Sequence, residues 1–170
     1  MVMAQQSDGT IAVMLADPAD TQTFAARLAP FARPGDVIAL AGDLGAGKTT
    51  FARGFINALL DVHGQPAEDV PSPTFTLVQE YQLSDFTLFH IDLYRIETQS
   101  ELFDLGLEDA FADGVSLVEW PDRLGPLLPA DRLELRFSQI SPTEDGDRRR
   151  VVVIPFGDWE GRLDAGALNG

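Results

Sequence analysis

The string GDLGAGKT, Gly42 to Thr49, matches the phosphate-binding pattern G-x-x-x-x-G-K-[ST] at every fixed position. It contains Lys48, the single lysine of the 170-residue chain, in which arginine otherwise supplies the positive charge. A lysine kept in this one place indicates a site that needs a compact, flexible ammonium group rather than a planar guanidinium. The string therefore predicts that Lys48 contacts the phosphates of a nucleotide.

The residues on both sides of this string fit a strand, a loop and a helix. Residues 37–41 (VIALA) form an apolar run after the turn signal of residues 34–36 (PGD), which is typical of a buried strand. Hydrophobic residues then recur at helical spacing, before a stop at residues 63–64, at Phe51, Phe55, Ile56, Leu59 and Leu60. In this arrangement backbone N–H groups and the helix N-terminus point at the phosphates, which favours nucleotide binding over an ordinary glycine-rich turn.

The loop supplies most of the residues that we expect to contact the nucleotide. Its glycines permit backbone angles and a close approach that larger side chains would block. A carboxylate near phosphates is repelled unless it faces water or metal, so Asp43 either faces solvent or orients the attacking water. The expected nucleotide contacts are Asp43, Gly45, Ala46, Gly47, Lys48, Thr49, Thr50 and Thr74.

Thr74 belongs to the proline-stiffened segment Ser72-Pro73-Thr74-Phe75. Its prolines favour an extended loop that presents the hydroxyls of Ser72 and Thr74 outward. Two interpretations stay open at this point. The segment is either a rigid entry into the strand that begins near Phe75 or a switch-like element that touches the γ-phosphate or its metal.

Two other apolar runs close on an acidic residue. Residues 88–92 (LFHID) end in Asp92, and residues 115–119 (VSLVE) end in Glu119. Phosphoryl chemistry with magnesium needs carboxylates at strand ends beside the loop, whereas a lone strand-end acid can simply face water. Glu119 is the sharper candidate, because Trp120 and a proline end its strand abruptly. The expected catalytic residues are Lys48, Asp92 and Glu119, and the expected magnesium ligands are Thr49 and Glu119.

Three neighbouring residues have both an ordinary and a functional interpretation. His90 lies on the same side of its strand as the aspartate two residues later, and it fits a packed histidine of the core or rim. Arg95 could neutralise charge on the transferred phosphoryl group, or it could pair with Glu97 or Glu101. Trp120 fits packing, with anchoring of a protein partner as the alternative.

Composition excludes several classes of protein. The chain has no cysteine and two histidines, which excludes disulfides and thiolate sites and argues against a multi-histidine zinc site. Its net charge of −15 repels nucleic acid, and the basic run at residues 148–150 fits a solvated strand start that balances the acids before it. A guanine-reading Asn/Thr-Lys-x-Asp segment would need a second lysine, so ATP is favoured over GTP. Without a membrane-spanning run or signal peptide, we expect a cytoplasmic protein.

The rest of the chain fits one α/β domain over residues 1–156, followed by a flexible C-terminal tail over residues 157–170. The expected elements are a strand at 11–15, a helix at 20–31, a hairpin of 75–81 and 86–92, a short helix capped by Ser100, a strand at 115–118, and a pairing of 133–137 with 151–154.

Four motifs in order carry a resemblance to a known family. They are GDLGAGKTT, SPTF, HIDLYR at residues 90–95 and VEWP at residues 118–121. The chain resembles the TsaE family, also called YjeE, small bacterial ATPases of tRNA threonylcarbamoyladenosine synthesis. The resemblance extends from about residue 11 to residue 154, nearly the whole chain.

The resemblance implies a single P-loop NTPase-type domain with a mixed central sheet flanked by helices, binding ATP and Mg²⁺. It also implies a weak ATPase that protein partners stimulate: a threonylcarbamoyl-transferase and its inactive paralogue, with tRNA reached only through that complex and no role for a membrane. By position, Lys48 would hold the β- and γ-phosphates, Thr49 and Glu119 the magnesium, and Asp92 would lie near the γ-phosphate. Two alternatives stay open, a small-molecule kinase and a nucleotide-gated docking module with negligible hydrolysis.

Overall fold

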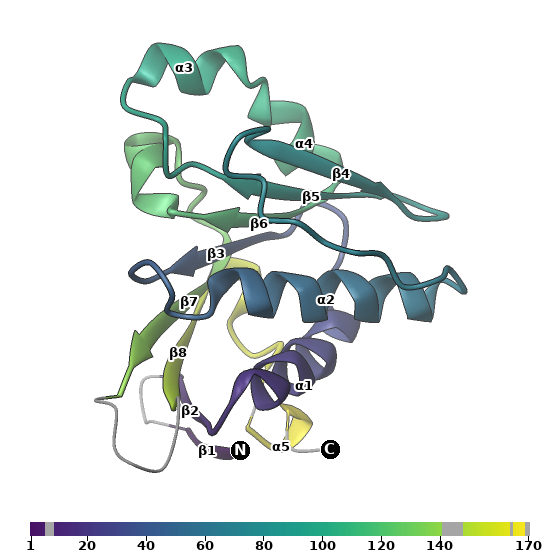
Figure 1. The fold of residues 1–170 in the computed structure, drawn as a ribbon, viewed down its shortest axis with the longest axis vertical. Coiled ribbons are helices and arrows are strands. Elements are labelled where there is room, and N and C mark those ends of the chain that lie inside the picture. Colours follow the sequence, from purple (N-terminus) through teal and green to yellow (C-terminus); the bar gives the residue numbers. More distant parts are fainter. Residues whose placement is uncertain (6–8, 141–147, 164, 169–170) are drawn as a thin grey trace.

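A computed structural model describes residues 1–5, 9–140, 148–163 and 165–168, and the backbone there forms one eight-stranded sheet (Figure 1). The strands are β1 (Val2–Gln5), β2 (Ile11–Leu15), β3 (Val37–Ala41), β4 (Val78–Gln82), β5 (Thr87–Asp92), β6 (Val115–Glu119), β7 (Arg132–Gln139) and β8 (Arg149–Phe156). Their order is β1-β2-β8-β7-β3-β6-β5-β4, with parallel pairing from β7 through β3 and β6 to β5 and antiparallel pairing outside. The prediction of an α/β domain with a mixed central sheet is confirmed.

Helices α1 (Pro18–Leu28) and α2 (Lys48–Val62) lie side by side across one face of this sheet (Figure 1). A Cβ atom on Gly54 of α2 would lie 2.8 Å from the Cα of Gln22 in α1, a distance that real Cβ contacts do not reach. Glycine at this position therefore lets the two helices pack closely. The 3₁₀ turn η1 (Ala29–Phe31) continues α1, so the expected helix at 20–31 is present with a tighter last turn.

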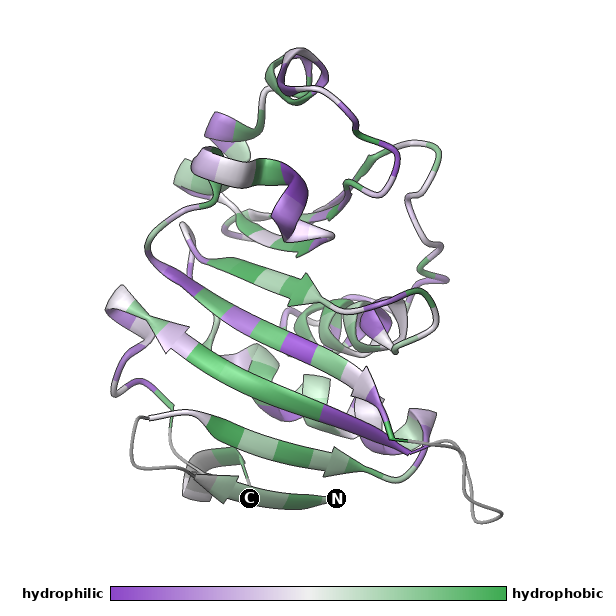
Figure 2. Cartoon of the chain, turned by 90° about the vertical axis from the view of Figure 1, so that its left-hand side faces the viewer, coloured by the Kyte–Doolittle hydropathy of each residue, from purple (hydrophilic) through white to green (hydrophobic). Residues whose placement is uncertain are grey.

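The hydrophobic residues that predict α2 are all buried between the helix and the sheet. The ring of Phe51 lies 5.7 Å from the ring of Phe24 in α1 and 5.7 Å from that of Phe137 in β7. Figure 2 views α2 end-on against strands that carry long hydrophobic stretches. This packing fixes the position of α2, and with it the phosphate-loop sequence that leads into the helix.

The opposite face of the sheet has its own, smaller hydrophobic cluster. Its cover consists of α3 (Gln99–Asp104), α4 (Leu107–Asp113) and the 3₁₀ segment η2 (Pro121–Leu127). Adjacent strand residues enter different clusters: Ile38 and Leu117 face the α1–α2 layer, while Val37 and Val118 face the second layer. The central strands are thus buried on both faces, as their uninterrupted apolar sequences predict.

Two expected boundaries are wrong. The antiparallel hairpin of β4 and β5 exists, but β4 begins at Val78 rather than at Phe75, because Leu77 has φ +67° and its N–H is bonded to the carbonyl of Pro73. The cap of α3 is Thr98, not Ser100: the side chain and backbone of Thr98 form a reciprocal capping box with Glu101.

The pairing of β7 with β8 is confirmed, with Leu135 opposite Val153. The turn between them, residues 141–147, lies outside the described residues. At the sheet's edge β1 pairs with β2 and was not predicted from the sequence. In the part of the chain that the structure describes, none of the helices has the length and apolarity needed to cross a membrane.

The described residues after Phe156, 157–163 and 165–168, pack against the domain, which corrects the expectation of a loosely attached tail. Trp159, in the 3₁₀ turn η3 (Gly157–Trp159), is 1% exposed, and Leu168, in α5 (Ala165–Leu168), is fully buried. Between them the guanidinium of Arg162 lies 4.1 Å from the centre of the Trp159 ring and donates to Asp36 at 2.7 Å. The sequence did not predict this packing, because it depends on single large side chains such as Trp159 rather than on a periodic hydrophobic pattern.

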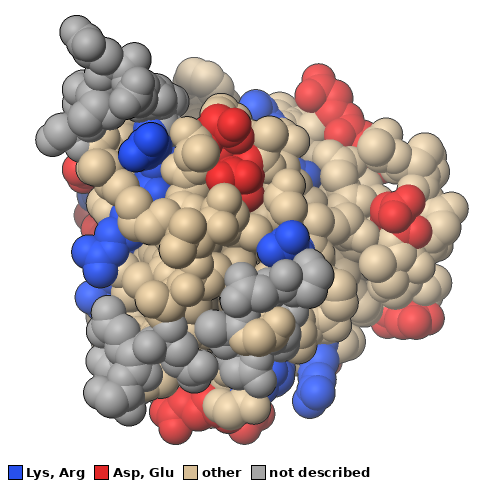
Figure 3. All heavy atoms as spheres, turned by 90° about the horizontal axis from the view of Figure 1, so that it is seen from below, with Lys and Arg blue, Asp and Glu red and all other residues tan. Residues whose placement is uncertain are grey.

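Figure 3 shows the end of the molecule that carries the termini. On the part of this face that is described, basic and acidic side chains are separated by broad uncharged areas. A surface that binds nucleic acid by charge needs clustered cations. This face offers no continuous basic band among its described atoms, in keeping with the net charge of −15.

Candidate nucleotide-binding site

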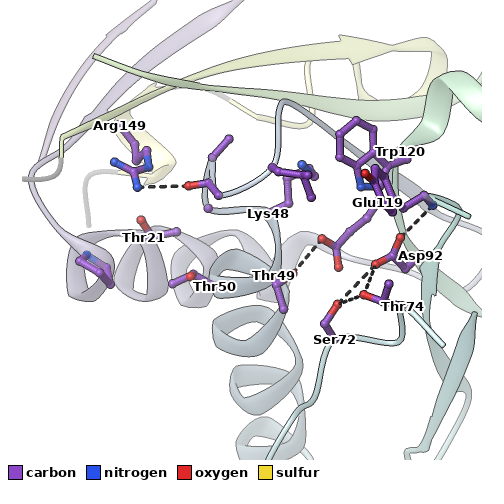
Figure 4. A pocket seen from close by; sticks show the side chains of 16 residues that line it. Thr21, Lys48, Thr49, Thr50, Ser72, Thr74, Asp92, Glu119, Trp120 and Arg149 are labelled. Carbon is purple, nitrogen blue, oxygen red and sulfur yellow. Dashed lines mark hydrogen bonds between the residues drawn. The ribbon is translucent and has the colours of Figure 1, made fainter. Parts of the chain in front are cut away.

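A cleft of about 290 Å³ opens at the carboxyl ends of the parallel strands β3, β6 and β5 (Figure 4). In open α/β sheets, ligands bind at this edge, outside the carboxyl ends of the strands. The lining residues come from the loop after β3, the start of α1, the SPTF segment, the ends of β5 and β6, and the start of β8. They are Pro18, Thr21, Leu44, Gly45, Ala46, Gly47, Lys48, Thr49, Thr50, Ser72, Thr74, Asp92, Tyr94, Glu119, Trp120 and Arg149.

The loop after β3 is held in a conformation that its glycines permit. Gly42 has φ +146°, and a Cβ atom there would lie 2.6 Å from the carbonyl oxygen of Phe137 in β7. Gly47, with φ +109°, precedes the first residue of α2, so the helix begins at Lys48 without a side-chain cap. The uncapped N–H groups of the first turn therefore face the cleft, where they favour a bound anion.

Lys48 is 5% exposed and folds back over its own loop. Its Nζ donates to the carbonyl oxygens of Gly42 at 2.5 Å and Asp43 at 2.8 Å, and it lies 4.2 Å from the centre of the Trp120 ring. Burial lowers the pKa of the Lys48 ammonium, opposed mainly by the negative charge of Glu119. The carboxylates keep a cation at the floor of the cleft, where an anionic phosphate would stabilise it further.

Glu119 ends β6 with its carboxylate inside the cleft and 2% of its surface exposed. Oε1 accepts a hydrogen bond from Thr49 Oγ1 at 2.9 Å, and Oε2 accepts from His90 Nε2 at 2.7 Å (Figure 4 shows the first of these). Because Thr49 gives its hydrogen to Glu119, the oxygen lone pairs of its hydroxyl group stay available. The structure thus brings together the two residues that the sequence predicts as magnesium ligands.

Asp92, at the end of β5, lies beside Glu119 in the parallel register of β5 and β6. Its Oδ1 accepts the backbone N–H of Tyr94 at 2.9 Å, and its Oδ2 accepts the hydroxyls of Thr74 at 3.2 Å and Ser72 at 3.4 Å. The SPTF segment therefore reaches the cleft and contacts the second carboxylate. Its hydroxyls face inward, where Figure 4 shows them converging on Asp92.

Asp43 differs from the other expected nucleotide contacts. Its side chain is exposed, and it is absent from the cleft lining, to which every other expected contact contributes. Arg95, which also had two interpretations, stacks its guanidinium 5.2 Å from the ring centre of Phe75, while Glu101 accepts from the backbone of Glu97 and of Thr98. The ordinary interpretation of Arg95, an ion pair with Glu97 or Glu101, is therefore not the arrangement found.

Arg149 is a cleft residue that the sequence interpretation missed. It begins β8, and its Nη2 donates to the carbonyl oxygen of Gly45 at 3.1 Å across the mouth of the phosphate loop. The only sequence signal was the basic run at 148–150, which alternation along a strand divides between two faces. That Arg149 faces the loop depends on the place of the β7–β8 pair beside β3 in the sheet, which local sequence does not specify.

The donor set fits magnesium that arrives with a nucleotide better than a protein-only metal centre. In the ranges that the structure describes, no cluster of three or more His, Asp or Glu side chains is arranged to hold a metal ion. Mg²⁺ in nucleotide sites takes one or two protein ligands and completes its shell with phosphate oxygens and water. A hydroxyl and a carboxylate 2.9 Å apart, beside a lysine and a helix N-terminus, meet that requirement.

Comparison with known proteins agrees with this geometry. The family described as "Threonylcarbamoyl adenosine biosynthesis protein TsaE" matches residues 15–151. The chain belongs to the TsaE family. It is 46% identical over 143 residues to the Bacillus subtilis tRNA threonylcarbamoyladenosine biosynthesis protein TsaE, covering 84% of each chain. It is 37% identical over 147 residues to the protein of that name from Streptomyces coelicolor, covering 85% of this chain and 96% of the relative.

A solved structure supports the fold over the whole length. The crystal structure of Bacillus subtilis YdiB superposes with a TM-score of 0.72 at 30% sequence identity, covering 99% of this chain and 97% of the other. The single-sheet, P-loop NTPase-type architecture is therefore shared with a relative.

Proposed function

We propose that this TsaE-family protein binds ATP with magnesium and hydrolyses it in support of N6-threonylcarbamoyladenosine formation in tRNA. It would act in the cytoplasm with a partner threonylcarbamoyl-transferase and that enzyme's inactive paralogue, reaching tRNA through them. The observation that carries the proposal is the meeting of Lys48, Thr49 and Glu119 in one cleft at the start of α2. Membership of the family supplies the pathway.

In this proposal the chain's own groups divide the work along the cleft. The N–H groups of the loop and the ammonium of Lys48 hold the β- and γ-phosphates, with Lys48 exchanging its two carbonyl contacts for phosphate oxygens. Thr49 and Glu119 hold the magnesium, which supplies charge neutralisation and Lewis acidity on the phosphates when bound. Asp92 orients either the attacking water or the Ser72–Thr74 segment against the γ-phosphate.

Hydrolysis then needs little covalent chemistry from the protein. Water oxygen bonds to the γ-phosphorus as the bond to the bridging oxygen of ADP breaks, and positioned charges carry most of the catalysis. The SPTF segment meets the site through the long hydrogen bonds of Ser72 and Thr74 to Asp92, at 3.4 Å and 3.2 Å. A slow reaction that a partner accelerates by fixing the SPTF segment is consistent with these contacts.

One observation weighs against the kinase alternative. A small-molecule kinase normally closes an arginine-rich lid over its acceptor, and the basic run at residues 148–150 is where this sequence would supply one. Arg149 opens strand β8, paired on both sides within the sheet, rather than a helical lid.

The test is phosphate release from ATP and from GTP without any acceptor, measured with and without the transferase and its paralogue. We expect slow release from ATP alone, clear stimulation by the partner complex and weaker use of GTP. Release that requires an added small-molecule acceptor would indicate the kinase instead. Binding without release under every condition would indicate a docking module.

Arg149→Gln tests whether ATP binds in this cleft, because Arg149 lies at its outer end. A charge-assisted contact to a bound phosphate is worth enough that its loss should weaken ATP affinity about tenfold at a half-buried position. The matched control is Arg150→Gln, the exposed neighbour on the other side of β8, which removes the same charge and should leave affinity unchanged. Equal losses in the two variants would show that only net charge matters.

A further inference from the structure

His90 is the most deeply buried ionisable side chain beside the cleft, and the proposed ATP hydrolysis gives it no role. It is fully buried in β5, and its Nε2 lies 2.7 Å from Oε2 of Glu119, which is itself 2% exposed. It does not line the cleft, so it stands behind the carboxylate rather than beside a ligand. A polar contact this short between two buried side chains requires an explanation beyond core packing.

The register of the sheet creates this contact. In the parallel pair β5–β6, His90 lies opposite Leu117, and Glu119 is two residues further along the same face of β6. An imidazole on β5 is therefore a diagonal neighbour of the carboxylate that ends β6. Along its own face of β5, His90 lies between Leu88, which is fully buried, and Asp92, which ends the strand at the cleft.

The chemistry of the two groups fixes the direction of the hydrogen bond. An ionised carboxylate only accepts hydrogen bonds, so the hydrogen comes from Nε2 of His90. Glu119 then has one donor on each oxygen: His90 on Oε2 and Thr49 on Oε1. These two hydrogen bonds fix the orientation of the carboxylate group, with Oε2 toward His90 in the core and Oε1 toward Thr49 and the cleft. Among the described residues, Nδ1 of His90 has no hydrogen-bond partner, so Glu119 is the polar contact that the ring makes there.

We propose that His90 is a positioning residue for the magnesium site: it fixes the orientation of the Glu119 carboxylate through Nε2–H without touching the nucleotide. The inference rests on the proposed magnesium-dependent ATPase and adds a residue to it. Residues behind metal ligands typically change metal affinity or activity by about 10–100-fold when removed. His90 should therefore matter for metal binding and turnover far more than for ATP affinity.

The variants separate the hydrogen bond from the volume of the ring. His90→Leu fills similar space without a donor. His90→Gln places an amide N–H where Nε2 lies and should restore function. Leu88→Val, on the same buried face of β5, controls for general damage to the strand.

The first measurement needs neither nucleotide nor activity. With two histidines in the chain, the imidazole N–H signals can be assigned by NMR using His63→Gln and His90→Leu. We expect a slowly exchanging Nε2–H signal from His90 that shifts in Glu119→Gln. A rapidly exchanging signal, or one that Glu119→Gln leaves in place, overturns the inference.

The second measurement is Mn²⁺ affinity, by electron paramagnetic resonance, of the protein saturated with a non-hydrolysable ATP analogue, alongside steady-state ATP hydrolysis. His90→Leu should weaken Mn²⁺ binding and lower kcat by at least about tenfold, with ATP affinity changed by less than about threefold. His90→Gln should lie near the wild type, and Leu88→Val should lower only the Tm. Wild-type metal affinity in His90→Leu, or equal loss in His90→Gln and His90→Leu, overturns the inference. A wild type that binds Mn²⁺ and the analogue but releases no phosphate contradicts the proposed ATPase, while the metal affinities still decide on His90.

Discussion

The Lys48→Ala variant should release phosphate from ATP at least about a hundredfold more slowly than the wild type, the scale seen when one preorganised donor to a developing charge is removed. Lys48 is the cation at the floor of the cleft, and Arg149 lies at its outer end, so nothing in the described lining replaces the ammonium beside Glu119. The loop should remain folded, because its conformation depends on glycine angles and on the start of α2. Phosphate release and Tm, measured on the same preparation, separate lost chemistry from lost structure.

Lys48→Arg sharpens this prediction because it keeps the charge. The ammonium fits between two carbonyl oxygens of its own loop and the face of Trp120, a space that suits a compact group. We expect the wider guanidinium to fail almost as completely as alanine. Arg150→Gln is the control for net charge, and we expect it to release phosphate from ATP at the wild-type rate. Normal ATP hydrolysis by Lys48→Ala would show that residues 42–49 are not a phosphate-binding loop.

The second large effect is expected at Glu119. Glu119→Gln keeps the shape of the side chain but removes the charge, and the magnesium stabilises charge chiefly as it develops in the transition state. Turnover should therefore fall by about a hundredfold or more, while ATP affinity changes by less than about tenfold. The amide also disrupts the arrangement in which Thr49 and His90 both donate to the carboxylate.

Asp92→Asn should behave differently, because Asp92 holds the hydroxyls of the SPTF segment rather than Thr49. ATP should stay bound, while turnover drops and stimulation by the partner complex is lost. If both acids were merely structural, each variant would show a lower Tm and normal kinetics per folded molecule. Normal ATP hydrolysis by both variants, with and without partners, would show that the site assignment is wrong even though the family membership stands.

The features that the sequence predicts well are those fixed by local chemistry. The buried strand before Gly42, the glycine-rich turn and the amphipathic helix after it are contiguous, so their pattern predicts both the local structure and the class of ligand without tertiary information. The location of Asp92 and Glu119 at one edge of the sheet is also predictable, since parallel strands bring their carboxyl ends to the same edge. The two acids are neighbours because β5 lies next to β6 in the strand order, which the sequence motifs do not specify.

The features that escaped prediction depend on contacts between distant segments. Arg149 faces the cleft because β8 pairs between β2 and β7, and His90 meets Glu119 because β5 and β6 are adjacent and in one register. The C-terminal segment packs through single anchors such as Trp159, too few to give a periodic pattern. The choice of Thr98 over Ser100 as a cap was decided by Glu101, three residues later, which completes the capping box.

Calorimetric titration of ATP with magnesium into the wild type and into Lys48→Ala tests the central claim most directly. We expect saturable binding at one site per chain in the wild type and weaker binding of GTP. In Lys48→Ala, at the same protein concentration and with folding verified by Tm, we expect the binding heat to be lost. Saturable ATP binding that is equally strong in Lys48→Ala would show that the phosphates do not lie in the cleft at the start of α2.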